Sequence, residues 1–64
     1  MNTNQPTPRQ REIIQLYTDS IQRAFTIEQL KAAKNTLRGF VYGLVTCNFM
    51  SMTEAKKIID RWCR

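Results

Sequence analysis

The sequence predicts an all-α domain of three helices, and three observations lead to this prediction. Apolar residues recur at helical spacing in three segments, which is the pattern of amphipathic helices. Each segment follows a Ser or Thr with Gln or Glu three residues later, the signature of a capping box. No segment alternates apolar and polar residues for long enough to indicate a strand. We therefore expect one compact three-helix domain over residues 7–64.

The first helix is predicted over about residues 8–24. The Thr7 hydroxyl can accept the Gln10 backbone N–H, the Gln10 side chain can reach back, and Pro8 suits the first helical position because it has no N–H. The polar residues 1–6 are expected to form a disordered tail. The stripe of this helix consists of Ile13, Tyr17, Ile21 and Ala24, joined by Ile14 and Ser20.

The second helix is predicted over about residues 27–47, with Thr26 and Gln29 as its capping box. Phe25 is placed to contact Leu30 as a hydrophobic staple, and Asn48 suits the left-handed position just after the helix. Apolar or small residues occupy most sides of this helix, so we expect it to be the central one. Its main apolar seam consists of Leu30, Ala33, Leu37, Val41 and Leu44.

The third helix is predicted over about residues 52–63, after a capping box formed by Ser51 and Glu54. The two connections between helices are short, so successive helices should be antiparallel neighbours. The apolar stripe of the third helix consists of Ala55, Ile58, Ile59 and Trp62.

The two cysteines are expected to be free thiols. Cys47 and Cys63 fall at the ends of successive antiparallel helices, about a helix length apart, which exceeds the Cα spacing that a disulfide allows. Reduced cysteines predict a cytoplasmic protein. The longest apolar run, residues 40–45, is too short to cross a bilayer, so no membrane partner is expected.

Catalysis is not expected. The chain has no histidine, the commonest general base, and no glycine-rich phosphate loop. Without histidine, two cysteines cannot complete a zinc site. We therefore predict a protein that is not an enzyme and has no cofactor, no metal and no small-molecule substrate. The acids, which suit helix starts and polar faces, are Glu12, Asp19, Glu28, Glu54 and Asp60.

Gly39 and Gly43 lie inside the second helix, where each costs about 1 kcal/mol relative to alanine. The favoured interpretation is that another helix of the same chain crosses closely over them. The second is that they form a flat patch for another chain, including a second copy of this one, and the third is a local kink. The residues hypothesised to bind a protein partner are Ala32, Thr36, Arg38, Gly39, Tyr42 and Gly43.

The net charge of +5 solubilises a small domain and also favours acidic partners. The preferred function is a small non-enzymatic helical protein, a regulatory or inhibitory module that binds another protein or a second copy of itself. The alternative is a basic protein that binds nucleic acid through the outer faces of the second and third helices. The residues assigned to that alternative are Lys31, Lys34, Arg38, Lys56, Lys57, Arg61 and Arg64.

Overall fold

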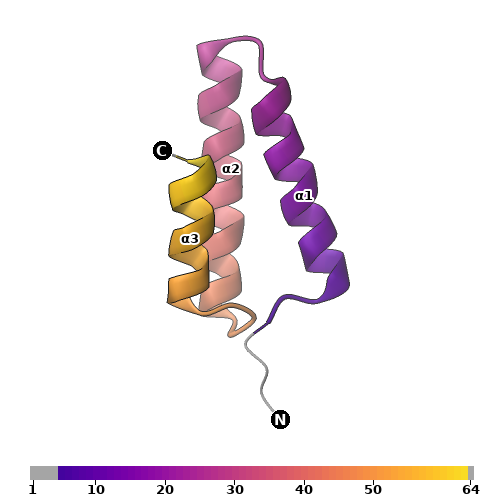
Figure 1. Cartoon of the computed structure of the whole chain (residues 1–64), viewed down its shortest axis with the longest axis vertical. Coiled ribbons are helices and arrows are strands. Elements are labelled where there is room, and N and C mark those ends of the chain that lie inside the picture. The colour runs from indigo at the N-terminus through magenta and orange to yellow at the C-terminus, as the bar shows by residue number, and fades with distance from the viewer. Residues whose placement is uncertain (1–4, 64) are drawn as a thin grey trace.

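Three helices connected by short turns make up the chain in a computed structural model that describes residues 5–63 (Figure 1). They are α1 (Pro8–Arg23), α2 (Ile27–Thr46) and α3 (Met52–Trp62). The predicted all-α fold is confirmed, and each helix ends one residue earlier than predicted. The expected last residues Ala24, Cys47 and Cys63 are instead C-caps with non-helical dihedral angles. Residues 1–4 of the predicted tail lie outside the described residues.

Each helix begins directly after its predicted N-cap residue, and the hydroxyl of that residue accepts a backbone hydrogen bond from the first turn. At α1 the reciprocal bond is also present, because the Thr7 N–H donates to Gln10 Oε1 at 2.8 Å and completes the capping box. Each satisfied hydroxyl bond pairs one of the N–H groups that a helix start leaves without an internal partner. The accepting hydroxyls are those of Thr7, Thr26 and Ser51, and the donating N–H groups are those of Gln10, Gln29 and Glu54, at 3.1, 3.0 and 3.1 Å.

The turn between α1 and α2 differs from the prediction. The Gln29 side chain accepts from the Phe25 N–H at 2.9 Å, where the predicted capping box would have it accept from Thr26. The predicted staple between Phe25 and Leu30 is wrong, because the Phe25 side chain is 95% exposed. Ala24 leaves the helix in an extended conformation, with φ −65° and ψ 131°, and this turns Phe25 outward from the hairpin.

The turn between α2 and α3 follows the predicted C-terminal motif. Asn48 adopts φ 66°, the left-handed conformation. Its N–H donates to the Val45 carbonyl at 3.1 Å, and the Phe49 N–H donates to the Leu44 carbonyl at 2.8 Å. This pair of bonds is the Schellman motif, which pairs the last carbonyl groups of a helix. It reverses the chain within a few residues, so α3 returns along α2.

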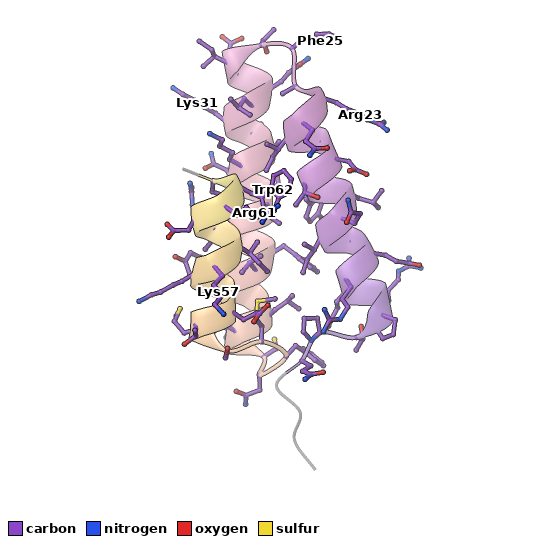
Figure 2. The ribbon with its side chains drawn as sticks, viewed as in Figure 1. Arg23, Phe25, Lys31, Lys57, Arg61 and Trp62 are labelled. Carbon is purple, nitrogen blue, oxygen red and sulfur yellow. The ribbon has the colours of Figure 1, made fainter. Side chains whose placement is uncertain are left out.

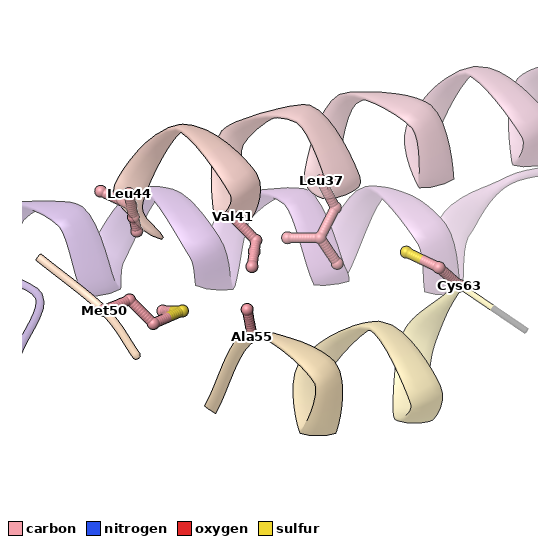
Figure 3. Packing of buried hydrophobic residues seen from close by; sticks show 6 residues of the cluster. All are labelled: Leu37, Val41, Leu44, Met50, Ala55 and Cys63. Atoms are coloured by element: carbon pink, nitrogen blue, oxygen red, sulfur yellow. The ribbon is translucent and has the colours of Figure 1, made fainter. Parts of the chain in front are cut away.

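The central position of α2 is confirmed. It packs against α1 and against α3, whereas α1 and α3 make only marginal contact with each other. In Figure 1, α1 and α3 run in the same direction on the two sides of the oppositely directed α2. The Tyr17 and Phe40 rings join α1 to α2 edge to face, with centroids 5.5 Å apart. The buried core, drawn in Figure 3, consists of Leu37, Val41, Leu44, Met50, Ala55 and Cys63.

The two cysteines occupy different environments. Cys63 is buried, and its thiol donates to the Lys34 carbonyl oxygen at 3.5 Å, which fixes the end of α3 against α2. Cys47 is exposed at the end of α2, and both are free. None of the described helices combines the length and the apolar composition needed to cross a membrane.

Replacing Ser51 with alanine should lower the free energy of unfolding by about 1 kcal/mol, because the Glu54 N–H loses its partner at the start of α3. Urea denaturation followed by circular dichroism measures this change. Thr53→Ala is the matched control at an exposed position in the same helix, and it should change the stability by less than about 0.5 kcal/mol. Equal effects of the two substitutions would contradict the capping role.

Candidate functional site

The side of α2 that carries Gly39 and Gly43 is uncovered. Both glycines are exposed, and a Cβ atom added to either would meet no packed neighbour within 4 Å among residues 5–63. Neither has a positive φ angle, and α2 continues as one helix through both. The favoured interpretation from the sequence, a close crossing by α1 or α3, is therefore wrong, because those helices pack on other sides of α2.

We define the glycine face as Ala32, Thr36, Gly39 and Gly43, which the sequence places on one side of α2. All four residues are exposed, and none is charged. The Thr36 hydroxyl donates to the Ala32 carbonyl at 2.9 Å, so its donor is already paired within the helix. The glycine face is thus a shallow, uncharged surface on a chain whose net charge is +5.

An apolar hollow of about 320 Å³ adjoins the glycine face near the start of α1. The absent side chains of the two glycines leave the partly buried Phe40 at this place, the buried Leu44 forms the bottom of the hollow, and Phe49 is exposed at its edge. Sequence reasoning missed the hollow, because its depth depends on the separation of two helices, which no residue pattern gives. Its lining consists of Gln10, Gly39, Phe40, Gly43, Leu44, Cys47 and Phe49.

Tyr42 and Arg38, the two larger residues of the hypothesised site, lie at the edge of the glycine face away from Phe40. Tyr42 is 42% exposed and is available to contact a partner. Arg38 is only partly exposed, and its Nη1 donates to Asn35 Oδ1 at 2.8 Å. The Arg38 guanidinium is therefore held along α2.

The basic residues of the nucleic-acid alternative do not share one face. Lys31, Lys56, Lys57 and Arg61 are exposed, and Lys34 and Arg38 are partly exposed. Arg64 lies outside the described residues.

On α3 the apolar stripe faces α2, so helical spacing places Lys56 and Lys57 on adjacent outward sides, with Asp60 on the side of Lys56. Arg61 lies on the side of Lys57 (Figure 2), and its guanidinium is 5.9 Å from the Trp62 ring centroid. Lys57 and Arg61 therefore share one side of α3, as their spacing of four residues predicts, and Lys56 lies beside that side.

A larger groove of about 550 Å³ lies between α1 and α3, where these helices fail to close on each other. Polar and apolar side chains line it, and the apolar ones include Ile14 from α1 and Ile58 and Trp62 from α3. Gln5 and Pro6 border it at the N-terminal end. Sequence reasoning missed this groove, because its apolar helix residues, Ile14, Ile58 and Trp62, also belong to the predicted core stripes.

Within residues 5–63, no three His, Cys, Asp or Glu side chains gather as a group that could hold a metal ion. Comparison of the chain with protein-family models, with characterised proteins and with solved structures found no match. The glycine face, the two hollows and the exposed side chains are therefore the features from which a function can be inferred.

Proposed function

We propose that this chain is a non-catalytic binding protein of the cytoplasm that recognises another protein chain through the glycine face of α2. The observation that supports the proposal is the open space over Gly39 and Gly43. Glycine in an exposed helix interior lowers stability by about 1 kcal/mol, and in the part of the chain that the structure describes no neighbour packs over either glycine. A partner that approaches the helix backbone closely supplies such a contact.

The shape of the surface favours a helix as the partner's contacting element. Side chains of one helix pack between those of another, and small residues four positions apart let two helices approach closely. The apolar hollow beside Phe40 and Phe49 provides a place for a side chain of the partner. Tyr42 on the opposite edge belongs to a residue type that is enriched at interfaces.

A second copy of the chain is the partner that we propose to test first. Two copies each carry a net charge of +5 and repel each other over most of their surface. The glycine face has no charged residue, so two copies can meet there without opposing charges. Such a contact is isologous, with the same surface used by both copies, which is the commonest arrangement of dimers.

The test is sedimentation equilibrium of the double variant Gly39→Leu, Gly43→Leu. The variant should raise the dimer dissociation constant at least about tenfold, because two bulky side chains fill the surface. Its helical content should stay unchanged, since leucine favours helix over glycine and the added Cβ atoms meet open space. Ser20→Leu adds the same bulk at an exposed position on α1 and should leave self-association unaltered.

A chain that sediments as a monomer at every concentration would contradict self-association. Affinity capture from a lysate of the source cell, with and without nuclease, then compares the wild type with the same glycine variant. Capture that nuclease abolishes, together with a salt-sensitive gel shift weakened in Lys57→Gln and Arg61→Gln, would favour the nucleic-acid alternative. Nucleic-acid binding is kept as the second candidate because α2 and α3 together carry four exposed basic residues.

A further inference from the structure

The tip of the α1–α2 hairpin presents two large apolar side chains to the surroundings. Phe25 is 95% exposed and Ile27 is 72% exposed, and only one residue separates them in the sequence. A side chain of this size normally gains from burial. Within the described residues, the Phe25 side chain is not buried and does not gain this free energy, because the turn directs it outward (Figure 2).

The third helix does not reach this tip. Its C-cap, Cys63, contacts the carbonyl of Lys34, so residues 27–33 of α2 extend beyond the end of α3. Figure 1 shows the α1–α2 turn well above that end. The tip is therefore built from two helices alone, and its apolar residues have no third helix to pack against.

Basic residues flank the apolar tip. Arg23 lies in the last turn of α1 and Lys31 in the second turn of α2, and their side chains point to opposite sides of the hairpin below Phe25 (Figure 2). Glu28, in the first turn of α2, is the acid of this region, placed where it complements the positive end of the helix dipole. The end of the tip is therefore apolar, formed by Phe25 and Ile27, and the basic residues Arg23 and Lys31 lie on either side of it.

The backbone of the turn has internal partners for several of its donors. The Phe25 N–H donates to the Gln29 side chain at 2.9 Å, and the Gln29 N–H donates to the Thr26 hydroxyl at 3.0 Å. The Ala24 N–H donates to the Ile21 carbonyl at 3.4 Å. A turn whose polar groups are paired loses less when it leaves bulk water.

We propose that the α1–α2 tip binds the surface of an anionic phospholipid bilayer. Phe25 and Ile27 enter the headgroup layer, where aromatic and aliphatic side chains gain apolar surroundings. Arg23 and Lys31 stay at the level of the lipid phosphates, and each basic residue near an anionic membrane adds to the attraction. This proposal departs from the sequence-based expectation of no membrane partner, which was argued from the lack of a segment long enough to cross a bilayer. A peripheral contact needs no such segment.

This inference is independent of the proposed function. The glycine face lies along the middle of α2, whereas the lipid contact uses residues 23–31 at one end. A variant with Leu at positions 39 and 43 should bind vesicles as the wild type does. Failure of either proposal therefore leaves the other intact.

The experiment is co-sedimentation of the full chain with vesicles. Phosphatidylcholine vesicles containing about 30% phosphatidylserine should bind the chain at least about tenfold more strongly than pure phosphatidylcholine vesicles. Phe25→Ser should lower binding to the anionic vesicles at least about tenfold. Leu16→Ser removes an apolar side chain that is 62% exposed on α1 away from the tip, and should leave binding within about twofold.

The position of the charges is tested by two double variants with the same net charge. Arg23→Glu with Lys31→Glu should abolish binding to the anionic vesicles, whereas Lys56→Glu with Lys57→Glu should retain most of it. Equal losses in the two would overturn the proposal, because any basic surface would then suffice. Equal binding to neutral and anionic vesicles, no binding to either, or unchanged binding of Phe25→Ser would overturn it as well.

Fluorescence then locates the contact. Trp62 is the only tryptophan of the chain and lies between α3 and α1 (Figure 2), so its emission should not change when wild-type chain binds vesicles. A Phe25→Trp variant should add a component whose emission shifts to shorter wavelength on binding. A shift of Trp62 emission in the wild type, with no additional shifted component in the Phe25→Trp variant, would place the lipid elsewhere and overturn the proposal.

Discussion

Replacing Leu37 with alanine is expected to lower the free energy of unfolding by about 2–5 kcal/mol. Leu37 is fully buried at the centre of α2, where the core brings residues of α2 and α3 together. The total stability of a 64-residue chain is about 3–10 kcal/mol by the usual value per residue. The substitution should therefore remove much of the stability and leave a measurable unfolded fraction at room temperature.

Thermal and urea denaturation followed by circular dichroism measure this effect. Leu16→Ala is the matched control, because it makes the same chemical change at a side chain that is 62% exposed. The control should alter the stability by less than about 0.5 kcal/mol. If both variants lost stability equally, Leu37 would not be more deeply buried than Leu16, and the described core would be wrong.

Replacing both Gly39 and Gly43 with alanine is expected to raise the free energy of unfolding by about 2 kcal/mol. Each alanine gains about 1 kcal/mol in helix propensity, and neither added methyl group meets a packed neighbour within 4 Å. For a domain of this size the gain corresponds to a rise of about 10 °C in Tm. Under the proposed function, the glycines lower the stability of the free chain because they keep this side of α2 open for a partner.

Ala32→Gly is the reverse substitution at an exposed position on the same face, and it should lower stability by about 1 kcal/mol. Calorimetry of the two variants gives both changes directly. A loss of stability in the double alanine variant would mean that something does pack over the glycines, and the glycine face would then not be free for a partner.

The fold could be predicted because its determinants are local. A hydroxyl residue at each helix start, Asn48 at the α2–α3 turn and apolar residues at helical spacing act within a few positions of the chain. The helix ends were predicted one residue too late, because the last residue of each expected helix is a cap. Each cap residue still donates its N–H to a helix carbonyl but has non-helical dihedral angles, so the helix ends one residue before it.

The candidate site could be predicted only in part. The sequence placed Ala32, Thr36, Gly39 and Gly43 together, since helical spacing fixes which residues share a side. It did not show whether α1 or α3 covers that side, because covering depends on how the helices cross. The Phe25 staple failed because Ala24 leaves α1 in an extended conformation that turns Phe25 outward, and the capping-box pattern does not specify that backbone angle.

The near absence of contact between α1 and α3 has a consequence for how the chain reaches its structure. Since α1 packs on α2 and α2 on α3, the contacts between helices join mainly helices that are consecutive in the sequence. Chains dominated by such nearby contacts have low contact order and fold within microseconds to milliseconds. Either hairpin can form first around α2, so folding need not wait for the two ends of the chain to find each other.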